Sequence, residues 1–310
     1  MAKLAVEVDR ALARRAEHGS AGDLSVRLLA QGDGWRVEDV VCSSGPRDRA
    51  FQEQHSQITI ALIGAGSFQY RTAAGHELMT PGSILLGSVG QCYECGHEHG
   101  AGDRCVAFHF TPGYFERLAA DAGALAAARA SSANGHGHAP VFRQLRLPPL
   151  RALSPFFARA CAGVTGAVDV AWEELSLRLA SEVVRVAEQV TPGDRGDQAG
   201  LDPSRTVARV TRAVRIIERR PDASLTLGRL AHDAGLSPFH FLRTFERLTG
   251  VTPHQYVLRA RLREAALRLV DDASRVLDIA LDCGFGDISN FNRAFRTEFG
   301  VTPRAYRRAG

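Results

Sequence analysis

The chain has 310 residues, 45% of them hydrophobic and 23% charged, which suits two globular domains of ordinary size. It contains no run of about eighteen uncharged apolar residues, the length that crosses a membrane. The N-terminus also lacks the apolar core and cleavage site of a secretory signal. We therefore expect a cytoplasmic protein whose six cysteines are thiols or metal ligands rather than disulfides.

The net charge of +4 is unevenly distributed along the chain. Residues 201–310 hold 19 Arg and Lys against 12 Asp and Glu, whereas the remainder holds 19 against 22. A basic module joined to a slightly acidic one is typical of a nucleic-acid-binding domain attached to a domain with another role.

Short apolar or alternating runs separated by Gly and Pro occupy the chain between about residues 23 and 111. This spacing predicts the strands of an antiparallel sandwich or barrel. The runs lie at 25–29, 35–42, 58–63, 67–71, 83–86 and 105–110.

A cluster of cysteine and histidine lies in the same region. Cys92, Cys95 and Cys105 are close in sequence to His97 and His99. A Cys-x-x-Cys pair supplies two thiolates, and a further thiolate and an imidazole can complete a tetrahedron around zinc. We predict a zinc site formed by the three cysteines and one of the two histidines, with iron or copper as alternatives. A thiol redox sensor, or buried thiols without special chemistry, would show the same pattern.

The middle of the chain connects this region to a helical C-terminus. Residues 122–140 are rich in Ala, Ser and Gly and predict a helix end followed by a mobile loop. Apolar residues recur every three or four positions from 153 to 190, which predicts helices packed beside the strands or against a second subunit. Residues 191–203 predict an interdomain linker. The expected boundaries are 1–190 for the first domain, 191–203 for the linker and 204–310 for the second domain.

The second domain contains one sequence pattern twice. Matches at many positions in constant order indicate a duplicated structural unit. Residues 231–235 (AHDAG) recur as 280–284 (ALDCG), 241–245 (FLRTF) recur as 291–295 (FNRAF), and 250–253 (GVTP) recur as 300–303, with a tyrosine three residues further on in each copy.

Each copy predicts a helix-turn-helix unit. Gly235 and Gly284 follow the first helix, where a left-handed turn favours glycine. Ser237 and Asp287 suit the start of the second helix. The two phenylalanines of each second helix are four residues apart and therefore face the core together.

The second helix of such a unit enters the major groove, so its remaining surface is available to bases. Arginine can bind guanine, asparagine can pair with adenine, and an aromatic ring can contact the methyl group of thymine. Solvated helix surface is the alternative interpretation of the same residues. The candidates are Phe239, His240, Arg243 and Arg247 in the first copy, and Ser289, Asn290, Asn292, Arg293 and Arg296 in the second.

Two further helices complete the second domain. Five arginines recur three or four residues apart before the first copy, as a stripe that either contacts phosphate or is simply solvated. Residues 253–269 predict one long helix that sets the spacing of the two second helices for successive major grooves. The stripe consists of Arg205, Arg209, Arg212, Arg215 and Arg219.

Residues 225–307 closely resemble the AraC/XylS transcription regulators. The motifs are LAHDAGLSPFHFLRTFERLTGVTPHQYV and IALDCGFGDISNFNRAFRTEFGVTPRAYR, of which the second is highly specific. The resemblance implies a homodimer and an N-terminal cupin barrel that senses a small molecule, with the cysteine–histidine cluster near the barrel mouth. It implies DNA contacts at Phe239 and Arg243, and at Ser289, Asn290 and Arg293.

We therefore expect an α+β multidomain protein, with a cupin-like β-barrel and flanking helices followed by an all-α domain with two helix-turn-helix motifs. Its expected function is sequence-specific binding of double-stranded DNA, as a dimeric transcription regulator that responds to a small molecule or a metal ion. The alternatives are a cupin metalloenzyme or a thiol redox sensor fused to a DNA-binding domain. The sequence has no nucleophile triad, no phosphate-binding glycine loop and no His-x-His pair at the first cupin segment, which argues against an enzyme.

Overall fold

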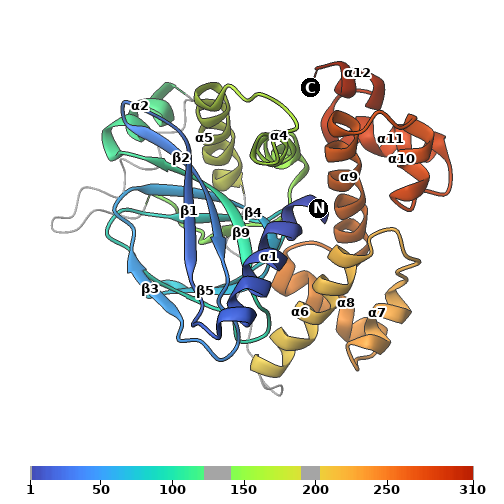
Figure 1. Cartoon of the computed structure of the whole chain (residues 1–310), viewed down its shortest axis with the longest axis horizontal. Coiled ribbons are helices and arrows are strands. Elements are labelled where there is room, and N and C mark those ends of the chain that lie inside the picture. Colours follow the sequence, from blue (N-terminus) through green and yellow to red (C-terminus); the bar gives the residue numbers. More distant parts are fainter. Residues whose placement is uncertain (1, 122–140, 190–202, 310) are drawn as a thin grey trace.

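The computed structural model describes residues 2–121, 141–189 and 203–309. Its N-terminal half (residues 2–189) consists of two β-sheets and several helices, and its C-terminal half (residues 203–309) is helical (Figure 1). The predicted loop at 122–140 and all of the predicted linker except Pro203 lie outside the described residues. None of the described helices combines the length and apolarity that crossing a bilayer requires.

The described strands form one sheet of six strands and one of four, and every pairing is antiparallel. The strand order is β1-β2-β9-β4-β7-β10 in the larger sheet and β3-β8-β5-β6 in the smaller. The strands are β1 (Leu24–Gly32), β2 (Trp35–Cys42), β3 (Phe51–Gln54), β4 (Ile58–Gly66), β5 (Phe68–Thr72), β6 (Gly75–Met79), β7 (Ile84–Gly87), β8 (Cys92–Gly96), β9 (Asp103–Phe110) and β10 (Arg146–Leu147).

The helices fall into an N-terminal and a C-terminal set. The N-terminal set is α1 (Ala2–His18), α2 (Pro112–Asp121), the 3-10 helix η1 (Arg151–Leu153), α4 (Ser154–Val164) and α5 (Trp172–Gln189). The C-terminal set is α6 (Pro203–Arg219), α7 (Leu227–Asp233), α8 (Pro238–Thr249), α9 (Pro253–Asp271), α10 (Val276–Asp282), α11 (Ile288–Phe299) and α12 (Pro303–Ala309).

The centre of the larger sheet is buried on both faces, as its strand β4 shows. Ile60 and Leu62 pack with α1, α4 and α5 in one core, whereas Ala61 and Ile63 pack against the smaller sheet in another. Because successive side chains of a strand point to opposite faces, β4 is buried at every position except Gly66 rather than alternating. The N-terminal half therefore has three layers: helices, larger sheet and smaller sheet (Figure 1).

The predicted barrel is not closed in the part of the chain that the structure describes. β1 and β10 end the larger sheet, β3 and β6 end the smaller one, and no described pairing joins these edges. A closed barrel needs hydrogen bonds around its whole circumference, so the observed arrangement is a two-sheet sandwich. The prediction of antiparallel strands is confirmed, whereas the cupin-like barrel is not.

The predicted helices between residues 153 and 190 are present as α4 and α5. Their apolar residues, among them Phe157, Leu175, Leu179 and Val183, are buried in the core beside the larger sheet. These helices therefore pack beside the larger sheet of their own chain. The homodimer stays a prediction.

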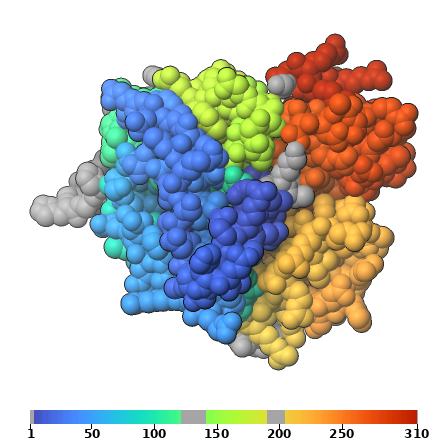
Figure 2. All heavy atoms as spheres, viewed as in Figure 1, coloured from blue at the N-terminus to red at the C-terminus, as the bar shows by residue number. Residues whose placement is uncertain are grey.

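The two halves of the chain contact each other directly. The Tyr256 hydroxyl of α9 donates a hydrogen bond of 3.1 Å to the Pro81 carbonyl. Arg146 of β10 donates to the Thr249 carbonyl at 2.8 Å and to the carboxylate of Glu77 at 3.0 Å. Figure 2 shows α4, in yellow-green, against the orange and red C-terminal helices, and α4 contacts both α9 and α11.

A buried ion pair joins β2 to β9 in the larger sheet. Asp39 and Arg104 are 5% and 4% exposed, and the guanidinium donates hydrogen bonds of 2.8 and 2.9 Å to the carboxylate. Burial by itself would raise the pKa of Asp39, but hydrogen bonds and charges from Arg104 and Arg27 outweigh it and hold that pKa below its usual range. The pair is therefore charged at neutral pH.

We expect Asp39→Asn to lower the free energy of unfolding by about 3 kcal/mol, because it leaves the Arg104 charge buried without a counter-charge. Urea denaturation at neutral pH measures the loss, and Asp33→Asn in an exposed turn is the control. Because the folded-state pKa of Asp39 is depressed, the difference between wild type and variant should shrink as the pH falls from 3.8 through that lower pKa. A loss of equal size at every pH would contradict this account.

Candidate nucleic-acid interface

The first helix-turn-helix unit has the predicted order of helix, glycine turn and capped helix. α7 ends at a turn in which Gly235 has a φ of 63°, the left-handed conformation that glycine tolerates. The Ser237 hydroxyl then accepts a hydrogen bond from the His240 amide at 3.3 Å, and Pro238 begins α8. These local features fix where the second helix starts.

The second unit repeats this design with different residues. Gly284, with a φ of 85°, ends α10, and a Cβ there would lie only 2.8 Å from the backbone of Asp222. The Asp287 carboxylate caps α11 by accepting a hydrogen bond from the Asn290 amide at 2.7 Å. Glycine is therefore required at this turn both for its conformation and for its size.

The repeated tyrosines complete the two cores. The phenylalanines predicted to face inward on α8 and α11 are fully buried. Phe245 meets Tyr256 edge-to-face at 5.6 Å with an interplanar angle of 86°, and Phe295 meets Tyr306 at 5.3 Å and 80°. Aromatic pairs favour this geometry. The repetition in the sequence is thus a repetition of one packing unit.

The outer face of α8 carries an aromatic ring and a cation. Phe239 is 70% exposed, and the Arg243 guanidinium lies 5.8 Å from the centre of its ring. Arg247 is also exposed, whereas His240 is half-buried. An exposed phenylalanine beside an arginine is available to a thymine methyl group and to a guanine edge.

The outer face of α11 is polar instead. Its predicted contact residues Ser289, Asn290, Asn292, Arg293 and Arg296 are all exposed. Arg293 donates a hydrogen bond of 3.3 Å to the amide oxygen of Asn290, so the two side chains lie together. This surface can pair with base edges through both donors and acceptors.

A basic groove of about 1540 Å³ runs beside α11. None of the described residues that line it is acidic. Such a surface attracts phosphate. The sequence did not single out most of its arginines, because they lie on elements that only the fold brings together. They are Arg151 of η1, Arg275 before α10, Arg293 and Arg296 of α11, and Arg304, Arg307 and Arg308 of α12.

Comparison with known proteins places this helical region in a family. A family profile described as a helix-turn-helix domain matches residues 230–309. The transposon Tn10 TetD protein of Escherichia coli is 40% identical over 92 residues, which make up 30% of this chain and 67% of that protein. The chain belongs to the AraC/XylS family of transcription regulators.

Other relatives match over a smaller share of their length. The HTH-type transcriptional regulator Rv1931c of Mycobacterium tuberculosis is 39% identical over 83 residues, 27% of this chain and 32% of that protein. A solved AraC-type regulator from Chromobacterium violaceum is 29% identical, with 33% of this chain and 92% of that chain covered and a TM-score of 0.32. The chain thus spans only about a third of Rv1931c.

The basic stripe of α6 in this AraC/XylS protein has more than one role. Arg205, Arg212 and Arg219 are exposed, as either a phosphate-contacting or a solvated face requires. Arg209 is half-buried, and Arg215 donates a hydrogen bond of 2.6 Å to the carbonyl of His99 in the N-terminal half. Part of the stripe therefore joins the two halves instead of facing DNA.

The AraC/XylS chain does not bring the predicted zinc ligands together. Cys92 and Cys95 lie three residues apart on β8, and the two-residue period of a strand points them to opposite faces. Cys92 is exposed, whereas Cys95 and Cys105 pack between the sheets. His99 lies 3.3 Å from the Ser204 hydroxyl of α6. The described residues therefore do not assemble the predicted ligand set, and zinc itself stays a prediction.

A different group of possible ligands does come together. Among the described residues, the ligand atoms of Cys42, His97 and Asp103 all lie within 4.8 Å of one another. His97 belongs to the predicted cluster, but no sequence pattern singles out Cys42 and Asp103, which are far apart in the chain. The paired strands β2 and β9 bring Cys42 and Asp103 face to face.

The thiol redox sensor also finds little support in these cysteines. Burial and the nearby Asp103 carboxylate raise the pKa of Cys95 and Cys105 well above the usual thiol value. Both are therefore protonated at neutral pH, whereas oxidant or electrophile sensing needs a thiolate. Cys92 is the only exposed cysteine among the six, all of which are described.

We expect Asp287→Ala to lower the free energy of unfolding by about 1 kcal/mol, because the Asn290 amide at the start of α11 loses its acceptor. Thermal or urea denaturation measures the change. Asp287→Ser is the matched control, since serine keeps a capping oxygen and should retain most of the stability. Equal losses in both variants would show that the carboxylate acts through some other contact.

Proposed function

We propose that this protein regulates transcription by binding double-stranded DNA through α8 and α11, and that each of these helices enters a major groove. The observation that carries the proposal is the duplicated unit, which holds two helices by the same caps and aromatic pairs and leaves their outer faces exposed. We infer a regulator rather than an enzyme, because several of the similar proteins are named as transcriptional regulators.

The two helices are expected to recognise different bases. α8 offers the stacked pair of Phe239 and Arg243, whereas α11 offers the hydrogen-bonded pair of Asn290 and Arg293. Apolar and arginine contacts favour thymine and guanine, while asparagine favours adenine. The preferred DNA site is therefore asymmetric within the stretch that one chain contacts.

The helix between the units supports simultaneous binding by both. α9 is continuous over 19 residues, so at about 1.5 Å per residue it is about 28 Å long. One turn of DNA rises about 34 Å, which is comparable. Arg261 also connects α9 to the segment that follows α6, through hydrogen bonds to the carbonyls of Pro221 and Ala223.

We further propose that the N-terminal half controls DNA binding in response to a small molecule or a metal ion. The support is the position of Tyr256, which packs on Phe245 in the core of the first unit and bonds to Pro81 of the N-terminal half. A change near Pro81 is thereby transmitted to the helix that carries Phe239 and Arg243. Coupling of this kind would appear as a change in DNA affinity on ligand binding.

We expect Arg293→Ala to weaken binding to preferred DNA by about 1–3 kcal/mol, because a base contact is lost. The DNA is obtained by selection from a random pool with the purified protein, and titration of a labelled fragment gives the affinity. Arg178→Ala, which alters an exposed arginine of α5 paired with Glu174, should leave the affinity unchanged. A loss of equal size on preferred and unrelated DNA would show that Arg293 contacts phosphate instead.

We expect Arg151→Ala to weaken binding to all DNA sequences alike, because Arg151 lines the basic groove from the N-terminal half. The plot of the logarithm of the binding constant against the logarithm of salt concentration should lose about one unit of slope. Arg178→Ala again serves as the control on the same half. An unchanged slope would exclude a phosphate contact by the N-terminal half at this position.

A further inference from the structure

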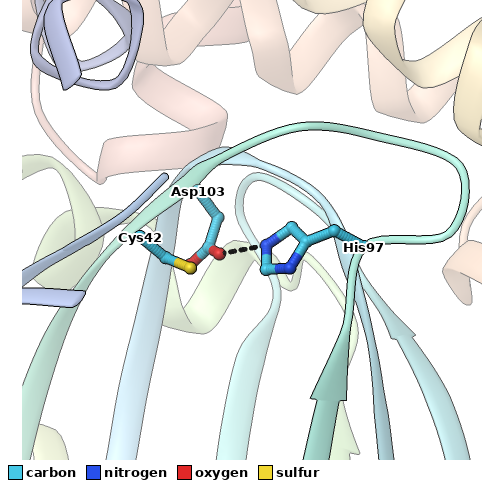
Figure 3. A group of neighbouring side chains, drawn as sticks. All are labelled: Cys42, His97 and Asp103. Carbon is cyan, nitrogen blue, oxygen red and sulfur yellow. Dashed lines mark hydrogen bonds and ion pairs between the residues drawn. The ribbon is translucent and has the colours of Figure 1, made fainter. Parts of the chain in front are cut away.

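Three side chains that can bind a metal ion meet at one end of the sandwich. Cys42 ends β2 and Asp103 begins β9, and the two residues are paired across the larger sheet. His97 directly follows β8 of the smaller sheet, so the group spans both sheets (Figure 3). All three are buried, and their ligand atoms lie within 4.8 Å of one another.

The three side chains supply a sulfur, a nitrogen and an oxygen, which together form a donor set that zinc accepts. Ligands bind zinc at about 2.0 to 2.3 Å in a tetrahedral arrangement, so the ligand atoms of one ion lie about 3.3 to 3.8 Å apart. The ligand atoms of this group lie within 4.8 Å of one another, so small side-chain shifts would bring them around one ion. Three protein ligands leave a fourth position for water or a small molecule, as in zinc sites that exchange ligands.

The surroundings of the group suit a metal centre. His97 Nε2 lies 2.6 Å from the Asp103 carboxylate, and an ion bound by both would replace this hydrogen bond. The amide of Ser44 donates to the Cys42 sulfur at 3.4 Å, which would help to stabilise a thiolate ligand. Asp48, another carboxylate whose charge acts on Cys42, is already paired with Arg15 at 2.7 Å.

The segment between two of the ligands also contacts the DNA-binding region. His99 lies between His97 and Asp103 in the chain, and its carbonyl accepts a hydrogen bond of 2.6 Å from Arg215 of α6. The ring of His99 lies 3.3 Å from the Ser204 hydroxyl at the start of the same helix. A change in how His97 and Asp103 are held therefore reaches α6 through a short, direct connection.

We propose that Cys42, His97 and Asp103 bind one Zn²⁺, and that occupancy changes the contact of residues 97–103 with α6 and so changes DNA affinity. The second half of this proposal rests on the DNA-binding function proposed above, whereas the first half does not. The site differs from the one that the sequence predicted, because only His97 is common to both sets.

The binding site is tested with the full-length chain after removal of metal by a chelator, using Co²⁺ as a spectroscopic probe and Zn²⁺ as its competitor. One zinc per chain and a thiolate-to-cobalt charge-transfer band are expected. Cys42→Ser should abolish the band and weaken zinc binding at least about 100-fold, because losing an outer partner of a ligand alone costs about 10- to 100-fold. Cys92→Ser, at an exposed cysteine of the sequence-predicted set, is the matched control and should change neither.

Further outcomes of this titration are also decisive. If Cys42→Ser fails to fold, His97→Gln is the alternative variant, because it keeps the Cys42 thiol. We expect His97→Gln to bind zinc more weakly, and its circular dichroism spectrum to match that of the wild type. Absence of stoichiometric zinc in the wild-type chain would overturn the site. Loss of the band in Cys92→Ser but not in Cys42→Ser would also overturn it, in favour of the sequence-predicted ligands.

The coupling is tested by measuring DNA affinity with and without bound zinc, on fragments selected by the protein. We expect the two affinities to differ by about 5- to 150-fold, the usual range for coupled sites. Arg215→Ala should still bind zinc but bring the ratio of the two affinities close to one. Equal affinities in the wild type would overturn the coupling and leave the zinc site standing. Failure to bind DNA in either state would instead overturn the proposed function.

Discussion

The burial of α9 is the constraint on which the rest of the structure depends. The buried residues of this helix point in several directions, so more than one of its sides must be covered. Each part of the chain packs against one of those sides. Tyr256, Val257 and Ala260 lie in the core of the first helix-turn-helix unit, Leu262, Ala265, Ala266 and Leu269 in the core of the second, and Leu267 in the core of the N-terminal half.

One charged residue of α9 strengthens this arrangement. Arg263 is buried, pairs with Glu218 of α6 at 2.7 Å, and lies over the rings of Phe157 and Tyr256 at 5.6 and 5.8 Å. A buried cation is costly unless it keeps its partners. The helices α4, α6 and α9 must therefore keep their relative positions around this guanidinium.

The C-terminal region was predictable from sequence because its determinants are local. Gly235, Ser237 and the phenylalanines four residues apart act within one or two turns of helix, so their spacing alone indicates the structure. The N-terminal half depends on contacts between distant residues. β3 is four exposed residues, and its pairing with β8 gives no apolar pattern to recognise.

The predicted zinc ligands illustrate the same limit. Closeness in sequence suggested Cys92 and Cys95, yet a strand separates such residues to opposite faces. Cys42 and Asp103 are 61 positions apart and become neighbours only through the register of β2 and β9. A strand assignment for residues 92–96 would have excluded the first pair, but only the fold identifies the second.

Leu78 of β6 and Ala158 of α4 lie inside the cores of the first and second helix-turn-helix units. The two halves are separate in sequence but not in packing, because the core of each unit includes a side chain from the N-terminal half. The C-terminal units are therefore difficult to transfer to another protein. A hybrid regulator that joined these units to a foreign N-terminal half would have to reproduce both side chains, or two hydrophobic cores would be left open to water.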